Sequence, residues 1–297
     1  MIRVVGFCPW GGEMPFASYV ELLKLRIGGM IALTAVVSYL SVAERVTLSH
    51  LFWLSLVMLL GASSSAVFNH WYDRDIDRIM ARTANRPLAR QAMGNPGHVL
   101  WLAGGLLLSG VSAAVWLFNP VVAVHLFLGA FFYGVVYTVW LKRRTWMNIV
   151  LGGLAGSFAV LAGAASVNPA LCALPLLLAL VLFFWTPSHF WSLAIYLKED
   201  YRQAGVPMLP VVVGERKAAY CILANSLLLV VASFLPWLFG QLGLIYLAGA
   251  VLAGLLFLGE NWRLVCLPTQ EMGRRNFMGS MRYLGILFIA IVTDVTF

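Results

Sequence analysis

Long runs without charge constrain this chain more than any other feature of its sequence. Residues 51 to 68 read LFWLSLVMLLGASSSAVF and contain no charged side chain. A helix needs about 20 apolar residues to cross the hydrocarbon core of a bilayer. Nine stretches come near that length: 24–43, 48–72, 98–118, 120–140, 146–166, 170–195, 218–239, 241–261 and 279–296. We therefore predict an all-α, polytopic membrane protein, a single domain over residues 1–297 with nine transmembrane helices around a central cavity.

Composition agrees with a membrane protein. Hydrophobic residues make up 61% of the chain and charged residues 11%, whereas soluble domains have about a quarter charged residues. The net charge of +8 would suggest nucleic acid as the partner of a soluble protein. In a membrane protein it is typical of basic cytoplasmic loops, so we expect a lipid bilayer and no nucleic acid as partner. The four cysteines are scattered, without the paired spacing of a zinc site or a disulfide framework.

The basic residues predict an orientation. If the nine helices alternate in direction, the N-terminus and the charged segments 73–97, 196–217 and 262–278 share one face. Arg45 is then the single residue, among 20 Lys and Arg, on the opposite face. Basic loops stay in the cytoplasm, so the N-terminus and these segments are expected there and the C-terminus outside. One alternative concerns the first stretch, because Lys24, Arg26, the run 27–40 and SVA at 41–43 resemble a signal peptide with its cleavage site.

The segment NHWYDRDID (69–77) places acids directly after the second apolar stretch. Asn69, Asp73 and Asp77 are four residues apart, and each such step drifts only about 40° around a helix. Their side chains therefore form one stripe, from which Asp75 points about 160° away. Grouped carboxylates repel one another and stay ionised only with a compensating cation. Oxygen ligands of this kind suit a hard ion, Mg²⁺ first and Mn²⁺ second.

A plainer interpretation of the same acids is a solvated helix end. In that case the carboxylates pair with Arg74, Arg78 and Arg82 nearby in the sequence. Acids at the C-terminus of a helix oppose its macrodipole, however. This observation favours the metal site over a solvated helix end.

A second polar cluster follows the sixth stretch, in HFWSLAIYLKEDYRQAGVPMLP (189–210). Tyr196 and Asp200 are again four residues apart, and His189 lies two turns before Tyr196 on nearly the same side. The second and sixth helices are expected to point the same way, so their charged ends can converge. The segments MARTANRPLAR (80–90) and LKRRT (141–145) bring basic residues to the same rim. A cation together with basic groups is what a diphosphate leaving group requires, although LKRRT alone would equally serve as an anchor to lipid phosphates.

These motifs together resemble a known family. An Asn-x-x-x-Asp-x-x-x-Asp pattern closing the second of nine helices, with a second acidic motif after the sixth, resembles the UbiA-type intramembrane prenyltransferases. From about residue 16 to the C-terminus the chain is similar to their heme O synthase branch, through NHWYDRDIDRIMARTANRPL, YTVWLKRRTWMNIVLGGLAG and HFWSLAIYLKEDYRQAGVPMLPVV. Tyr196 stands where other branches have an aspartate. The chain departs from the branch at Ser188 and at Phe158-Ala159, where prolines are frequent.

The resemblance implies a specific reaction. Farnesyl diphosphate would bind through Mg²⁺, ionise to a farnesyl cation and alkylate a vinyl group of heme b, and addition of water would give heme O. The implied metal ligands are Asn69, Asp73, Asp77 and Asp200. The implied catalytic residues are Asp73, Asp77, Asp200 and Tyr196, and the implied substrate-binding residues are Arg82, Arg86, Lys142, Arg143, Lys198 and His189. The resemblance further implies the inner (plasma) membrane of a bacterium, with a heme A synthase or a terminal oxidase receiving the product.

A UbiA-type prenyltransferase that acts on another acceptor remains an alternative within the family. Two other classes of membrane protein remain as alternatives outside it. An ion-coupled transporter also places carboxylates in the membrane, but usually near the midplane in broken helices. A heme carrier without chemistry would need His or Tyr ligands and no aspartate stripe. The feature that separates these classes from the prenyltransferases is the combination of Asn69, Asp73, Asp77 and Asp200.

Overall fold

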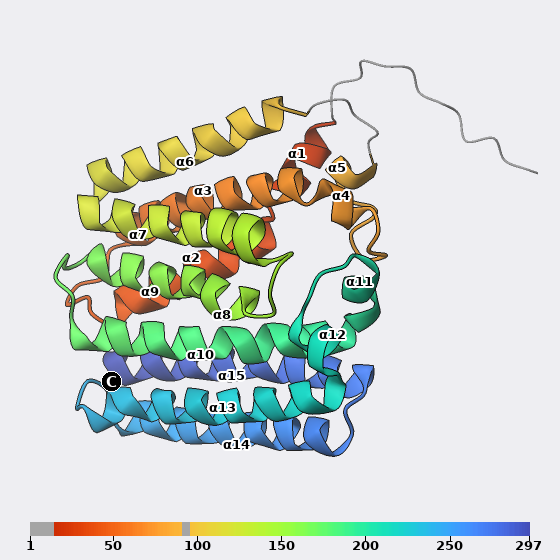
Figure 1. Cartoon of the computed structure of the whole chain (residues 1–297). Helices are drawn as coiled ribbons and strands as arrows, with labels where there is room; N and C mark the ends of the chain where they lie inside the picture. The colour runs from red at the N-terminus through yellow and green to blue at the C-terminus, as the bar shows by residue number, and fades with distance from the viewer. Residues whose placement is uncertain (1–14, 91–95) are drawn as a thin grey trace, which may run out of the picture.

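The structure, a computed structural model, describes residues 15–90 and 96–297, and all regular structure in these ranges is helical. Figure 1 shows the long helices side by side, with their axes along a common direction. Eight spans are long and apolar enough to cross a membrane. They are α3 (Leu48–Tyr72), α6 (His98–Leu117), α7 with η1 (Pro120–Phe131, Phe132–Leu141), α8 with α9 (Asn148–Gly152, Leu154–Ala165), α10 (Ala173–Tyr196), α13 (Glu215–Leu238), α14 (Leu244–Cys266) and α15 (Gln270–Thr296).

The first predicted stretch, 24–43, forms a shorter helix. It contains α2 (Leu25–Leu40), whose 16 residues fall below the length of the other spans. The helical membrane architecture is therefore confirmed, but the count of nine spanning helices is not. Arg3 and the predicted cytoplasmic N-terminus lie outside the described residues. The helix α2 packs inside the bundle between α3 and α9, where the Ser38 hydroxyl donates to the Val160 carbonyl at 2.7 Å.

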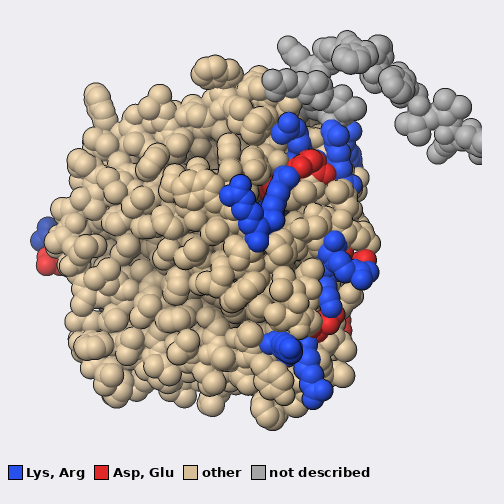
Figure 2. Space-filling model, viewed as in Figure 1, with Lys and Arg blue, Asp and Glu red and all other residues tan. Residues whose placement is uncertain are grey.

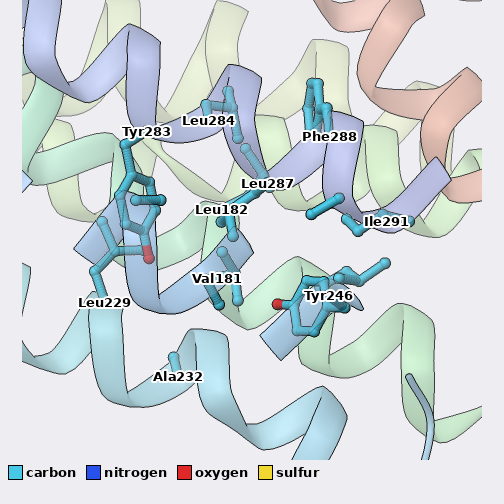
Figure 3. Close-up of a cluster of buried hydrophobic side chains, with 14 of the residues drawn as sticks. Val181, Leu182, Leu229, Ala232, Tyr246, Tyr283, Leu284, Leu287, Phe288 and Ile291 are labelled. Atoms are coloured by element: carbon cyan, nitrogen blue, oxygen red, sulfur yellow. The ribbon is translucent and has the colours of Figure 1, made fainter. Parts of the chain in front are cut away.

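The second half of the chain has its own large apolar core. Helices α10, α13, α14 and α15 pack together, and Figure 3 shows side chains of this cluster meeting between them. Tyr283 is buried there, and its hydroxyl lies 2.5 Å from the Ser233 hydroxyl. Packing and side-chain hydrogen bonds hold helices together in lipid, where water does not drive them together.

Charged residues gather at one end of the bundle. Figure 2 shows Lys, Arg, Asp and Glu side chains concentrated at the right-hand end, whereas the broad face between the ends is nearly all tan. The short helices α1 (Phe16–Leu22), α4 (Arg74–Asp77), α5 (Pro87–Arg90), α11 (Lys198–Gln203) and α12 (Leu209–Val213) lie at that charged end. The C-terminus lies at the opposite end (Figure 1). This separation agrees with the predicted sharing of one face by the charged loops.

The last helix is longer than its apolar stretch predicted. The apolar stretch covers 279–296, but α15 begins at Gln270, where the Thr269 side chain accepts a hydrogen bond from the Met272 N–H. This N-cap starts the helix in the charged segment. Apolar patterning marks the part of a helix that lies in lipid, and so it misses turns that extend beyond it.

We predict that Gly163→Ala destabilises the bundle. A Cβ at Gly163 would overlap the backbone carbonyl of Ala35 on α2, and backbone cannot rotate away as a side chain can. Overpacking of this kind costs about 1–3 kcal/mol, measurable as a lower thermal denaturation midpoint in detergent. Gly104→Ala on α6 is the matched control, because a Cβ added there would meet no atom within 4 Å. Equal midpoints for the two variants would contradict the close approach of α2 and α9.

The charge separation also predicts a topology. A reporter fused after Phe297 is expected outside the cytoplasm, and one inserted beside Arg144, in the loop after η1, inside it. Alkaline phosphatase and green fluorescent protein fusions report the two sides. Finding both reporters on one side would show that the number of crossings between these positions is wrong.

Candidate functional site

The predicted acidic stripe continues across a break between two helices. The helix α3 ends at Tyr72 and α4 begins at Arg74, with Asp73 between them at φ −88° and ψ 3°. Backbone hydrogen bonds from Asp73 to Asn69 (2.9 Å) and from Asp77 to Asp73 (2.8 Å) nevertheless keep the four-residue spacing. Asn69, Asp73 and Asp77 are buried, with exposures of 3%, 0% and 2%. The shared burial of the three, against the 61% exposure of the Asp75 side chain, is what the predicted stripe requires.

Asn69 connects three segments of the chain. Its side-chain amide donates to Asp73 Oδ2 at 2.6 Å and to the Thr138 hydroxyl at 3.1 Å. Its carbonyl oxygen accepts a hydrogen bond from Lys24 Nζ at 2.9 Å. One amide therefore ties the start of α2 and the middle of η1 to the end of α3.

The buried carboxylates are neutralised by basic side chains. Lys142 Nζ lies 2.5 Å from Asp73 Oδ2, and Arg86 Nη1 lies 2.7 Å from Asp77 Oδ2. Arg143 Nη2 approaches Asp73 Oδ1 at 3.5 Å. Buried charges are stable only when they are paired in this way. Lys142 and Arg143 come from a distant segment and Arg86 from the loop after α4. None of them lies on the next turn of the helix, which disfavours the interpretation of a solvated helix end.

Asp75 forms a different kind of ion pair, at the surface. Its two carboxylate oxygens each accept a hydrogen bond of 2.6 Å from the Arg143 guanidinium. Partial burial acts to raise the pKa of Asp75, but the hydrogen bonds from Arg143 and from the backbone of Ile76 outweigh it and hold the pKa below its ordinary value. The Arg143 guanidinium also lies 5.0 Å from the Tyr72 ring centroid.

A π-helix places the basic and aromatic side chains of η1. The Lys142 N–H donates to the Tyr137 carbonyl at 2.8 Å, a five-residue step. In an α-helix, residues nine apart such as Tyr133 and Lys142 point in opposite directions. The wider winding makes nine residues about two turns, so Tyr133 and Lys142 share the face that looks toward α3. Segments of π-helix occur frequently at functional sites.

The second motif lies beside the stripe without joining it. Asp200 Oδ2 accepts a hydrogen bond from the backbone N–H of Arg82 at 3.3 Å, and Lys198 pairs with Glu215 at 2.7 Å. Tyr196 is 38% exposed, whereas Tyr201 is buried in a cluster that Tyr137 also packs against. Among the described residues, no group of three or more His, Cys, Asp or Glu side chains could hold a metal. The roles of Asp200, Lys198, Arg82 and Tyr196 therefore stay predictions.

His189 lies inside α10 and is held by its neighbours. Its Nδ1 is 2.7 Å from the Ser280 hydroxyl, and its ring stacks on Trp185 with centroids 4.2 Å apart. Phe277 on α15 also contacts the imidazole, with ring centroids 4.4 Å apart. The imidazole is thus fixed in orientation, and its predicted contact with substrate stays a prediction.

Sequence reasoning does not single out several residues of the site. In the sequence Lys24 is a basic flank of the first span, yet its side chain reaches Asn69. It is the one non-glycine residue in the described chain with positive φ, at 47°, a strained conformation that often marks a functional site. Thr138 and Tyr133 are hidden in an apolar run. Of these three residues, only Lys24 has a signal in the sequence, because a lysine directly before an apolar run is unusual enough to notice.

An apolar cavity begins beside the stripe. It lies between α2, α3, α7 and α9, and Lys24 and Tyr133 line it at the charged end of the bundle. Small residues form most of its walls: Gly28, Gly61, Ala62, Ser65, Ala66, Gly129, Ala130, Ala155, Gly156 and Ala159. The site therefore combines a charged mouth with an apolar interior, which suits an amphiphilic substrate.

The donor set fits a hard divalent cation. Asp73 and Asp77 carry carboxylate oxygens, and Asn69 carries an amide oxygen, which accepts a hydrogen bond from Lys24 Nζ in this structure. Mg²⁺ is bound in proteins through one or two carboxylates together with substrate phosphates. Lys142 and Arg86, which balance the acids, are the basic groups that a diphosphate would also meet.

Comparison with known proteins agrees with this geometry. The UbiA prenyltransferase family matches residues 30–290. Protoheme IX farnesyltransferase 1 of Paramagnetospirillum magneticum is 56% identical over 281 residues, covering 95% of this chain and 99% of that protein. Protoheme IX farnesyltransferase of Granulibacter bethesdensis is 39% identical, with 98% and 96% covered.

Solved structures show the same fold at low identity. A digeranylgeranylglyceryl phosphate synthase superposes with a TM-score of 0.77 at 19% identity, over 94% of this chain and 98% of the other. A UbiA homologue from Archaeoglobus fulgidus, bound to DMAPP and Mg²⁺, superposes with a TM-score of 0.66 at 17% identity, over 93% and 99%. The chain therefore belongs to the UbiA prenyltransferase family, in the branch of the protoheme IX farnesyltransferases.

Proposed function

We propose that this protein transfers a farnesyl group from farnesyl diphosphate to a vinyl group of heme b, giving heme O. The observation that carries the proposal is the pair of buried carboxylates, Asp73 and Asp77, beside basic groups at the mouth of an apolar cavity. The charged mouth suits a diphosphate and the cavity suits its prenyl chain. The names of the relatives supply the acceptor, heme b.

The chain's own residues would divide the work as follows. Asn69, Asp73 and Asp77 would hold Mg²⁺, with Mn²⁺ as a substitute and Asp200 as a further ligand. When bound, the cation neutralises charge on the departing diphosphate. Lys142, Arg86 and Arg143 would bind the diphosphate oxygens, each already placed by an aspartate. Their fixed positive charge stabilises the diphosphate as the carbon–oxygen bond breaks, without reorganisation at that moment.

The apolar walls would protect the farnesyl cation that bond cleavage leaves. Ala66, Ala130 and Gly156 line the cavity and cannot react with it, and they keep water away. The rings of Tyr133 and Tyr137, with centroids 5.7 Å apart, lie near Lys142 and offer π faces to a carbocation. Water must then reach the adduct at the mouth, where the hydroxyl of heme O is added.

The remaining predicted residues lie around this centre. Arg82, Lys198, Tyr196 and His189 are proposed to contact the acceptor or the diphosphate from the loop after α4 and from α10 and α11. An ion-coupled transporter is the less suitable alternative, because the carboxylates lie at the end of α3 and not near its middle. We further propose the bacterial inner membrane, cytoplasmic active-site loops, and a heme A synthase or terminal oxidase as the recipient of heme O.

The first experiment asks for the product. Purified protein with heme b, farnesyl diphosphate and Mg²⁺ is expected to give a pigment with the mass of heme O, read by mass spectrometry. Mn²⁺ should substitute, and excess chelator should abolish the product. Full turnover in chelator would overturn the role of the metal, and an unchanged pigment mass under all conditions would overturn the acceptor.

The second experiment uses the direction of the three aspartates. Asp73→Asn and Asp77→Asn keep the side-chain size but remove a buried charge at the mouth, and losing such a contact typically costs about 10²–10³ in rate. Asp75→Asn is the matched control, because it loses only a surface pair with Arg143 worth about 0–1 kcal/mol. Heme O formation is measured for each variant and normalised to folded protein. Equal losses at all three positions would contradict the stripe.

A further inference from the structure

Two large side chains, Met58 and His125, line the end of the apolar cavity that lies away from the charged mouth. The helices α2 and α9 run away from the charged end, and α3 and α7 run toward it (Figure 1). On each helix one lining residue is therefore farthest from the charged end: Met58 on α3, His125 on α7, Ile31 on α2 and Ala159 on α9. We call these four residues the floor of the cavity. Met58 is 5% exposed and His125 9%. Between this floor and the mouth, the walls are mostly Gly and Ala.

The distance from Met58 to the acidic stripe follows from helix geometry. Met58 and Asn69 are eleven residues apart on α3, which corresponds to about 16 Å along the axis. An extended carbon chain gains roughly 1.2 Å per bond. A farnesyl chain then reaches about 14 Å from its diphosphate oxygen, a geranyl chain about 10 Å and a geranylgeranyl chain about 19 Å. The distance from Asn69 to Met58 therefore accommodates a farnesyl chain and is too short for a chain with one more isoprene unit.

Aromatic packing holds the His125 side chain of the floor in place. The His125 ring stacks on Phe158 of α9, with centroids 6.1 Å apart and planes at 28°, and Phe158 in turn contacts Phe132 at 5.2 Å. His125 Nδ1 has no hydrogen-bond partner among the described residues, so ring packing and not a polar network fixes the side chain. Ala159 lines the cavity at this end, and Phe158 packs against His125 without lining the cavity.

We propose that His125 and Met58 set the prenyl chain length that the enzyme accepts, by ending the cavity one farnesyl length from the diphosphate site. The inference rests on the proposed function in one respect, that the cavity takes the prenyl chain. It goes further by assigning the preference for a C15 donor to two named side chains. Adding one isoprene unit would force its terminal carbons against the imidazole or the thioether, where a close-packed interior cannot yield without strain.

The test varies the floor and the donor together. For wild type, His125→Ala, Met58→Ala and Ala159→Leu, kcat/KM is measured with geranyl, farnesyl and geranylgeranyl diphosphate. The two alanine variants are expected to raise the geranylgeranyl-to-farnesyl ratio at least tenfold, and Ala159→Leu to raise the geranyl-to-farnesyl ratio, because pocket volume discriminates chains by such factors. Val57→Ala is the control: Val57 is fully buried beside Met58 but does not line the cavity. Its ratios should match wild type even if its stability falls.

A binding readout separates this proposal from the proposed reaction. Unreactive thiodiphosphate analogues of the three chain lengths are added with Mg²⁺ at equal concentrations, and the rise in denaturation midpoint is recorded, since a ligand that binds more tightly stabilises the folded protein more. Analogue preferences that shift in the alanine variants support the floor even if no heme O is formed, in which case the acceptor is wrong. Heme O formation with unchanged chain preference in both alanine variants would overturn the floor and leave the reaction standing.

Discussion

Two buried carboxylates set the conditions for everything around them. Asp73 and Asp77 are almost completely shielded from water, and a buried ion without a partner costs several kcal/mol. Their partners come from the end of η1 and from the loop after α4, so ion pairing fixes the relative positions of these segments. The same basic groups are the ones that a diphosphate needs. The ion pairs that stabilise the fold at this end therefore also position the basic groups of the proposed diphosphate site.

The membrane explains why the site has this layered form. Charged side chains are concentrated at one end of the bundle (Figure 2), and the interior next to them is apolar. Helices approach closely there because small residues allow it, as Gly163 does against Ala35 and Gly61 against Leu126. An amphiphilic donor can thus place its diphosphate among charges and its chain among Gly and Ala. The reaction centre is expected at the boundary between the two layers.

Sequence reasoning predicted the acidic stripe and its basic neighbours better than the other residues that surround them. The four-residue spacing was enough to place Asn69, Asp73 and Asp77 on one face and Asp75 on the other, because helical geometry is local. The basic runs correctly indicated Arg86, Lys142 and Arg143 as neighbours of the acids. Lys24 and Thr138 were missed, because a lysine beside an apolar run does not indicate Asn69 as its partner, and Thr138 carries no signal in the sequence. Tyr201, not Tyr196, is the buried tyrosine of the second motif.

The sequence by itself determined the class of the molecule: apolar runs of spanning length, basic residues on one side, and a spaced set of acids whose motifs resemble one family. These properties depend on residues close together in the chain, where period and composition suffice. Tertiary structure alone decided which cation faces which acid, where the cavity ends, and that η1 winds as a π-helix that turns Tyr133 and Lys142 to one face. Such features arise from packing between helices far apart in sequence, which no local pattern records.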